Sequence, residues 1–237
     1  MKKIQFIPIT EDVLELFDPP VPAKSVLPEW YNKQTPYTSE KLSGIPNGIP
    51  NLTVKKCMPV LDDMTAGYII KLNSDLIIEK QADGNVAIAA TYLCNKELIS
   101  THSTAQISHF PVPPEYSIHP FKFNNFWRIK TPKGYSCLFR HPFYHTTDQP
   151  FYSLSGLVDT DQHPVNVNFP FLLRNDFEGV IPYGTPIIQI IPFKRQEWEM
   201  EIINDEDNVA GDLEWNKATK KAMHRYKDNW RSLKSWK

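Results

Sequence analysis

The stretch Gly184-Thr185-Pro186-Ile187-Ile188-Gln189-Ile190-Ile191-Pro192-Phe193 carries the clearest structural signal in the chain. It is short, rich in isoleucine and bounded by glycine and proline, which is typical of a β-strand. The chain has 21 prolines against 9 glycines, and the prolines run from Pro8 to Pro192. Because proline interrupts helices but is tolerated in loops and at sheet edges, the chain up to Pro192 has little room for long helices.

Short apolar segments of the same kind recur along the chain and predict a mainly β fold. Asp83-Gly84 separates two of them, and this dipeptide is typical of a tight hairpin turn. The run Val165-Asn166-Val167-Asn168-Phe169 alternates apolar and polar residues, as a half-buried strand does. The predicted strands are 3–8, 67–72, 75–80, 86–93, 126–130, 135–140, 165–173 and 186–193.

Four other stretches read as irregular or helical structure. Residues 17–22 predict a polyproline-like or turn-rich segment, and residues 27–31 predict a short helical turn. Residues 34–56 are rich in turn-forming residues and predict a surface loop. The aromatic, proline-rich stretch 108–125 either caps the core or lines a ligand cleft.

The character of the chain changes near its C-terminal end. Residues 197–214 hold eight acidic and no basic residues, whereas residues 217–237 hold eight basic residues and one acid, Asp228. Aromatic and apolar residues recur there at helical spacing, so we predict a helix over 212–236. Its basic face is either a solvated surface or a contact for phosphates or an acidic partner.

Composition excludes several classes of protein. The net charge of −1 provides no overall attraction to nucleic acid, and no apolar run is long enough to span a membrane. Three cysteines without a CxxC spacing argue against a disulfide framework and a zinc ribbon, so we expect a cytoplasmic protein. No P-loop, GxGxxG, GxSxG or HExxH motif occurs.

Four segments, in order, resemble motifs of the dUTPase family, which shares the β-clip fold with the dCTP deaminases. The resemblance covers little over a quarter of the chain, mainly residues 131–193. The matching segments are Ala66-Gly67-Tyr68, Thr131-Pro132-Lys133-Gly134-Tyr135 leading into Ser136-Cys137-Leu138-Phe139-Arg140, Gly156-Leu157-Val158-Asp159-Thr160-Asp161, and Gly184-Thr185-Pro186-Ile187-Ile188-Gln189-Ile190-Ile191. The overall pattern also resembles uncharacterised proteins of tailed bacteriophages.

The resemblance implies a β-clip barrel with additions at both ends. We expect a proline-rich N-terminal extension over 1–60, the barrel over 61–203, and an acidic linker with the C-terminal helix over 204–237. Family members cover their exposed sheet edges by trimerising, so we expect a homo-oligomer, with a trimer as the implied form. A phage-encoded chain would lie in the host cytoplasm or in the virion.

The resemblance also implies which residues would work on a nucleotide. In the family, the first Asp of the third motif orients the attacking water, a role that falls to Asp159, with Asp161 and Arg140 as further catalytic candidates. This sequence departs from the family at four places. Ile69 replaces the Asp that helps to hold magnesium, His141-Pro142 replaces Ser-Ser, and Gln162-His163-Pro164 replaces Tyr-Arg-Gly. The predicted basic, aromatic C-terminal helix stands where the family has a glycine-rich arm that wraps the phosphates.

These replacements argue against ordinary dUTPase activity, because a triphosphate needs charge compensation and hydrogen-bond donors. Magnesium could still bind, but without the usual first-motif ligand, and we name no metal ligands. We expect Tyr135, His141, His163 and Gln189 to contact a ligand. The histidines are alternatively loop residues that satisfy local hydrogen bonds, and Asp159 and Asp161 are alternatively turn formers.

Three functions remain open at this point. The first is a non-catalytic or weakly catalytic binder of a nucleotide-like small ligand or a protein partner. The second is a hydrolase that acts on a nucleotide or modified nucleotide through Asp159. The third is a phage structural or accessory protein whose barrel serves only as a trimerisation unit. We expect neither a membrane nor a nucleic-acid partner.

Overall fold

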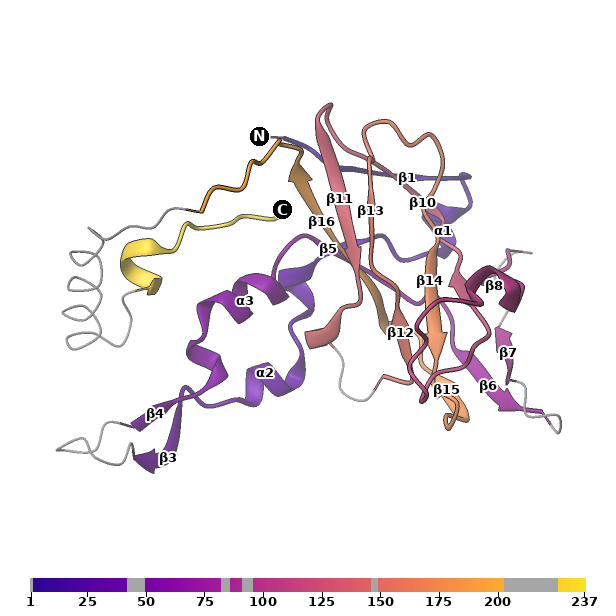
Figure 1. Cartoon of the computed structure of the whole chain (residues 1–237), viewed down its shortest axis with the longest axis horizontal. Helices are drawn as coiled ribbons and strands as arrows, with labels where there is room; N and C mark the ends of the chain where they lie inside the picture. The colour runs from indigo at the N-terminus through magenta and orange to yellow at the C-terminus, as the bar shows by residue number, and fades with distance from the viewer. Residues whose placement is uncertain (1, 42–49, 82–85, 91–95, 146–148, 203–225) are drawn as a thin grey trace. The chain divides into compact units, whose positions relative to one another are not determined.

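The computed structural model describes residues 2–41, 50–81, 86–90, 96–145, 149–202 and 226–237 (Figure 1). The chain divides into two compact units. Unit 1 comprises Met1–Asn32, Met64–Arg195 and Trp236–Lys237, and unit 2 comprises Lys33–Asp63 and Gln196–Ser235.

Unit 1 is built on a five-stranded antiparallel sheet. Figure 1 shows its strands β16, β11 and β13 side by side. The strand order is β13 (Gly156–Val158), β11 (Tyr135–Arg140), β16 (Pro186–Lys194), β5 (Tyr68–Lys71) and β2 (Val21–Pro22). The four segments that resemble dUTPase motifs therefore contribute four neighbouring strands to one sheet.

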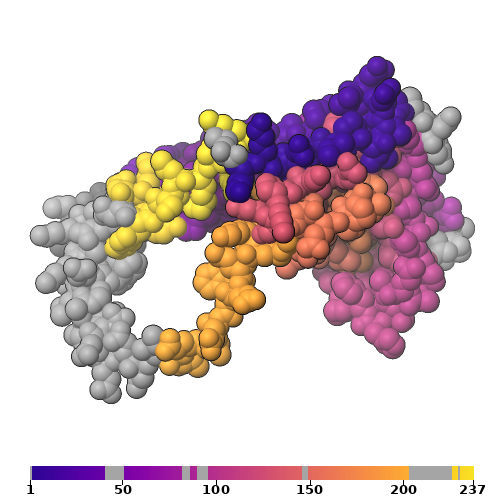
Figure 2. Space-filling view, turned by 90° about the horizontal axis from the view of Figure 1, so that it is seen from above, coloured from indigo at the N-terminus to yellow at the C-terminus, as the bar shows by residue number. Residues whose placement is uncertain are grey.

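Three smaller antiparallel sheets complete the β structure of unit 1. One has the order β12 (Phe151–Ser153), β14 (Phe169–Leu173), β9 (Phe121–Phe123), β8 (Ile99–Thr101). A second has the order β15 (Gly179–Ile181), β6 (Leu76–Lys80), β7 (Val86–Ala90). The third pairs β1 (Gln5–Pro8) with β10 (Trp127–Lys130), and in Figure 2 the indigo N-terminal chain lies beside the rose-coloured middle of the chain.

The main core of unit 1 lies between these sheets and is dominated by aromatic rings. Phe123 and Phe171 stack with ring centroids 3.9 Å apart, and Phe151 packs edge-on against both. Ile188 and Ile190 of β16 are fully buried in the same cluster. Rings of this size contribute a large buried apolar area, so this cluster holds the sheets together.

Short helical segments connect the strands. In unit 1 these are α1 (Val13–Leu16), η1 (Ala23–Val26), η3 (Thr104–Ile107) and η4 (Phe143–His145), and α2 (Glu29–Lys33) ends at the border with unit 2. Unit 2 contains the paired strands β3 (Tyr37–Lys41) and β4 (Pro50–Leu52), the turn η2 (Val54–Lys56), most of α3 (Met58–Met64) and a π-helical turn, η5 (Tyr226–Trp230).

The mainly β class predicted from sequence is confirmed. Each of the eight predicted segments contains a strand. The strand ends differ from the predicted ends by at most a few residues, and β11 has the predicted bounds. The two predicted hairpin arms pair as β6 and β7, while the Asp83-Gly84 turn lies outside the described residues. Among the described strands no sheet closes on itself, so the finer prediction of a barrel is not confirmed.

The predicted strand 165–173 begins only at Phe169. Residues 165–168 form no strand because their asparagines bond to the backbone of a residue far away in the sequence instead. The Asn166 amide donates to the carbonyl oxygen of Asn125 at 2.6 Å, and the Asn168 side chain accepts from the Asn125 N–H at 3.0 Å. Asparagine side chains commonly compete with ladder pairing in this way.

Two other sequence predictions were wrong in part. Residues 34–56 contain β3 and β4 as well as loop. Most of the predicted helix 212–236 lies outside the described residues, but its end is not helical beyond Trp230, because Arg231 and Lys234 both bind the Asp62 carboxylate of α3 at 2.6 Å and 2.9 Å. These tertiary ion pairs compete with helical geometry.

In the aromatic stretch 108–125, Phe121 and Phe123 form a core strand.

Candidate functional site

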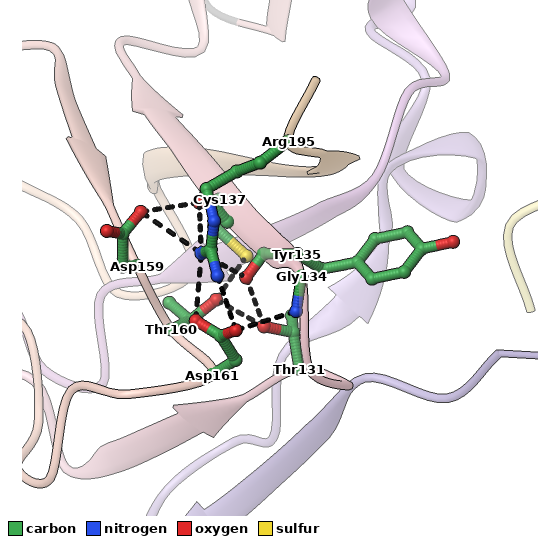
Figure 3. A network of polar contacts seen from close by, with 9 residues as sticks. Thr131, Gly134, Tyr135, Cys137, Asp159, Thr160, Asp161 and Arg195 are labelled. Atoms are coloured by element: carbon green, nitrogen blue, oxygen red, sulfur yellow. Dashed lines mark hydrogen bonds and ion pairs between the residues drawn. The ribbon is translucent and has the colours of Figure 1, made fainter. Parts of the chain in front are cut away.

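Three segments of unit 1 meet at the Tyr135 end of β11. Asp159 follows β13 directly, and Arg195 follows β16 directly. Both strands run antiparallel to β11, with Val158 opposite Cys137 and Lys194 opposite Tyr135, so their last residues lie beside the start of β11. The sheet register thereby brings Asp159, Asp161 and Arg195 together (Figure 3).

Arg195 and Asp161 form a two-pronged ion pair at the centre of this network. The guanidinium donates to Oδ1 of Asp161 at 2.8 Å and to Oδ2 at 2.6 Å, and the Gly134 N–H donates to Oδ2 at 2.7 Å. The Asp161 side chain is only 3% exposed. The Arg195 guanidinium, with help from the Gly134 N–H, lowers the pKa of Asp161 to about 2. Asp161 therefore stays ionised and holds the turn in place.

The same guanidinium is tied to the start of β11. It donates to the hydroxyl of Ser136 at 2.8 Å and to the carbonyl oxygen of Tyr135 at 3.1 Å, while the Arg195 N–H donates to the carbonyl oxygen of Gly134 at 2.9 Å. The Asp161 carboxylate raises the pKa of Arg195. Arg195 is thus a fixed positive charge rather than a mobile surface side chain.

Asp159 is the solvent-facing carboxylate of the network. Its Oδ1 accepts from the buried Ser136 hydroxyl at 2.6 Å and lies 3.2 Å from Arg195 Nη1. The Asp159 side chain is nevertheless 60% exposed. The result is an oriented carboxylate at the protein surface, which is the kind of group that can position a water or a ligand hydroxyl.

A buried polar layer supports the network from beneath. The hydroxyls of Thr131 and Thr160 lie 2.7 Å apart, and Thr131 donates to the carbonyl oxygen of Tyr135 at 3.0 Å. Thr160 also donates to the sulfur of Cys137 at 3.4 Å. Burial raises the pKa of the Cys137 thiol to about 11, so Cys137 acts as a small apolar residue rather than a nucleophile.

A pocket of about 930 Å³ opens beside the network, and we call it the basic pocket. It is lined by Lys2, Lys3, Gln5, Lys130, Thr131, Pro132, Lys133, Gly134, Asp161, Gln162 and Arg195. Its four lysines are exposed, and within the described part of the chain none of them forms an ion pair. Since its single carboxylate, Asp161, is already paired with Arg195, the pocket carries an uncompensated positive charge.

Arg140 and Gln189 lie at the opposite end of β11. They face each other across the β11–β16 ladder, and the Arg140 guanidinium donates to Oε1 of Gln189 at 3.0 Å and 3.2 Å. The Gln189 amide donates to the carbonyl oxygen of Ala66 at 2.8 Å, and Gln189 is buried. Arg140 lies four residues along the strand from Ser136, a distance of roughly 13 Å. The structure therefore does not bring Arg140 together with Asp159 and Asp161.

The two histidine candidates make local contacts. His141 is buried, its Nδ1 accepts from the Ser153 N–H at 3.2 Å, and burial lowers its pKa to about 4. It therefore remains neutral at physiological pH. His163 lies in the turn after Asp159, and its Nδ1 is 2.8 Å from the carbonyl oxygen of Val165.

Tyr135 and Ile69, two further positions singled out from the sequence, contribute no side-chain group to the ion-pair network. The Tyr135 ring points away from the ion-pair network in Figure 3, and Lys2 Nζ lies 5.9 Å from its centroid. Ile69 is fully buried in β5, where the resembling family has a magnesium-binding Asp. Within the described residues, no group of three His, Cys, Asp or Glu side chains is arranged to hold a metal ion.

Sequence reasoning missed Arg195 and the lysines of the basic pocket. Lys2 and Lys3 precede β1, Lys130 ends β10 and Lys133 lies in the following turn, so only the β1–β10 pairing gathers them. The pair Lys2-Lys3 and the short spacing of Lys130 and Lys133 were visible as local basic clusters. Nothing in the sequence indicated that the two clusters adjoin.

Comparison of the chain with protein-family models, with curated proteins and with solved structures found no match. Across the described residues, no helix has the length and apolar character needed to cross a membrane.

Proposed function

We propose that this chain binds a phosphate-bearing, nucleotide-like ligand in the basic pocket, without a complete catalytic set. The observation that carries the proposal is the charge of the pocket: Lys2, Lys3, Lys130 and Lys133 have no ion-pair partner among the described residues, and Asp161 is occupied by Arg195. Lysine ammonium groups attract phosphate as point charges, and the pocket volume of about 930 Å³ exceeds what a single phosphate group needs.

The sheet arrangement supports the nucleotide-like character of the ligand. The segments that resemble the dUTPase motifs form the neighbouring strands β5, β11, β13 and β16 of one sheet, so they lie together as parts of one structural unit. The basic pocket lies at the end of this sheet beside the third-motif Asp161. On the separate resemblance of the overall sequence pattern to uncharacterised proteins of tailed bacteriophages, we infer a phage-encoded protein acting in the host cytoplasm or in the virion.

Isothermal titration calorimetry with inorganic tripolyphosphate, ATP, dUTP and uridine tests the proposal. We expect the three polyanions to bind, uridine not to bind, and the affinity to fall steeply with salt. The triple substitution Lys3→Gln, Lys130→Gln, Lys133→Gln should weaken tripolyphosphate binding by about 100-fold. Lys24→Gln, Lys80→Gln, Lys122→Gln removes the same charge outside the pocket and should leave binding unchanged. Equal affinity of both triple variants would contradict the proposal.

A second candidate is a nucleotide phosphohydrolase that uses Asp159. The orientation of its exposed carboxylate by Ser136 and Arg195 favours this function, whereas the remote position of Arg140 removes one expected phosphate ligand. Release of phosphate or pyrophosphate from nucleotides in the presence of magnesium is the readout. Asp159→Asn should abolish the release, and Asp176→Asn, which alters an exposed carboxylate paired with Arg174, should not.

A structural or accessory role as a homo-oligomer, including the trimer implied by the family resemblance, is the third candidate. It predicts that the mass in solution is a multiple of the chain mass and that no ligand of the panel shifts the melting temperature.

A further inference from the structure

The chain directly after Arg195 exposes an unusual row of apolar side chains. In the segment Glu197-Trp198-Glu199-Met200-Glu201-Ile202, the side chains of Trp198, Met200 and Ile202 are 87%, 85% and 87% exposed. The segment belongs to no helix or strand. Large exposed apolar side chains that lie close together commonly mark an interaction surface. We call residues 197–202 the acidic-apolar segment.

Charge and apolar surface alternate along this segment. In an extended chain successive side chains point to opposite sides, so Glu197, Glu199 and Glu201 would line one side at intervals of roughly 6.6 Å. Trp198, Met200 and Ile202 would line the other side. No ion pair involves these glutamates within the described residues. The segment therefore presents three uncompensated negative charges in a row.

The basic pocket is the complementary surface on the same chain. It carries four lysines that lack an ion-pair partner among the described residues, and the segment carries three such glutamates. We propose that the acidic-apolar segment of one copy occupies the basic pocket of a second copy. This inference shares the pocket of the proposed function but does not depend on the identity of its ligand.

Occupancy by a second copy is favoured over occupancy by the chain's own segment. Arg195 lines the pocket and is held there by Asp161, and Glu197 follows it by only two residues. To place Glu199 and Glu201 in the same pocket, the chain would have to reverse within a few residues. Gln196–Ile202 contains no glycine, proline, asparagine or aspartate to favour such a turn. A segment from a second copy needs no reversal.

The contacts expected in the occupied pocket follow from the residue types. Glutamate carboxylates pair with the lysines, and the Trp198 indole can lie over a lysine ammonium group, as the Tyr135 ring already does with Lys2. Reciprocal exchange between two copies gives a two-fold dimer, and head-to-tail use of the same contact gives a closed ring. Because a polyphosphate and the segment need the same lysines, the ligand should dissociate the assembly.

A charge-swap experiment with full-length chains tests this inference. One variant carries Glu197→Lys, Glu199→Lys, Glu201→Lys, and the other carries Lys3→Glu, Lys130→Glu, Lys133→Glu. Light scattering after size exclusion and native mass spectrometry measure the mass of each variant and of their mixture at about 100 µM. We expect the natural chain to be oligomeric, each variant alone to be monomeric, and the equimolar mixture to form a mixed assembly.

The control Glu11→Lys, Glu15→Lys, Glu178→Lys makes the same charge change at exposed sites elsewhere and should keep the natural mass. A monomeric natural chain, an unchanged mass of the variants, or a mixture that stays monomeric would each overturn the inference. The inference would also be overturned if the chain is monomeric and its Glu197→Lys, Glu199→Lys, Glu201→Lys variant binds tripolyphosphate more tightly. That result would indicate that the segment occupies the basic pocket of its own chain. Tripolyphosphate binding by a monomeric natural chain would leave the proposed function intact while overturning this inference.

Discussion

Gly67, the residue before β5, lies against the backbone of Ile190 in β16, with no room between them for a side chain. A Cβ atom at position 67 would overlap the carbonyl oxygen of Ile190, and the φ angle of Gly67 is +68°, in the left-handed region that favours glycine. This glycine belongs to the Ala66-Gly67-Tyr68 segment that resembles a family motif. Its role in this structure is to let two strands of the main sheet meet.

Gly67→Ala should therefore destabilise unit 1 by about 2 kcal/mol or more, because it adds both backbone strain and a clash with main-chain atoms that cannot rotate away. The midpoint of urea unfolding, followed by tryptophan fluorescence, measures the loss. Gly156→Ala is the matched control, since a Cβ there meets nothing within 4 Å, and it should change stability by less than about 0.5 kcal/mol. Equal effects of the two substitutions would contradict the close approach.

The ion pair between Asp161 and Arg195 predicts an acid transition. The pKa of Asp161 is lowered to about 2, whereas an unfolded Asp titrates near ~3.9. Its contribution to stability is therefore complete above about pH 4 and is lost as the pH falls towards 2. The difference in unfolding free energy between the natural chain and Asp161→Asn should shrink over this range. If the unfolding free energies of the natural chain and Asp161→Asn differ by the same amount at pH 5 and at pH 2, Asp161 does not act as an ionised partner of Arg195.

Burial of neutral His141 predicts a second loss of stability on acidification, in which the folded state favours the neutral form of the side chain rather than the charged form. Its pKa is lowered to about 4, so between ~6.5 and 4 the unfolded chain binds a proton that the folded chain does not. Stability should fall as the pH drops through this window, by at most about 3 kcal/mol, and the loss should level off below it.

His141→Asn tests this assignment, because an asparagine oxygen can accept from the Ser153 N–H without titrating. Unfolding free energies measured at pH 7 and pH 5 should differ less in His141→Asn than in the natural chain. His163→Asn, at a less buried histidine, should retain the natural pH dependence. A ring-proton titration of His141 with a midpoint near ~6.5 would contradict the prediction.

The two described cysteines should differ sharply in reactivity. Cys57 is exposed, whereas Cys137 is buried and its pKa is raised to about 11. In a Cys94→Ser background, we expect Ellman's reagent to modify one thiol quickly in the folded protein and the second only after unfolding, because the thiolate is the reactive form. Adding Cys57→Ser should remove the fast reaction. A fast reaction that persists in this double variant would contradict the burial of Cys137.

The strand pattern could be predicted from sequence because a strand is a local property. Aromatic residues and isoleucines, in short runs bounded by glycine and proline, located β11 and β16, and a hairpin signal located the arms β6 and β7. Prediction failed where a side chain had a nonlocal alternative. Asn166 and Asn168 bond to Asn125, and Arg231 bonds to Asp62, and neither contact leaves a trace in local periodicity.

The candidate site was predictable only in part. Asp159 and Asp161 were found because they end a recognisable strand motif, and the structure places them side by side in one network. Arg140 was assigned to the same site from the resemblance to the second dUTPase motif, but it lies five residues from Tyr135, at the far end of β11. Arg195, two residues after the last predicted strand, is the cation that meets the two carboxylates.

By itself, the sequence determined the β class, the positions of most strands and the presence of a paired-aspartate turn, because these follow from residue propensities over a few neighbouring positions. Only the tertiary structure decided which cation serves those aspartates and that Lys2, Lys3, Lys130 and Lys133 share one pocket. The physical reason is that antiparallel register joins residues far apart in the chain, and the free energy that selects a register resides in the packed core rather than in the charged residues it brings together.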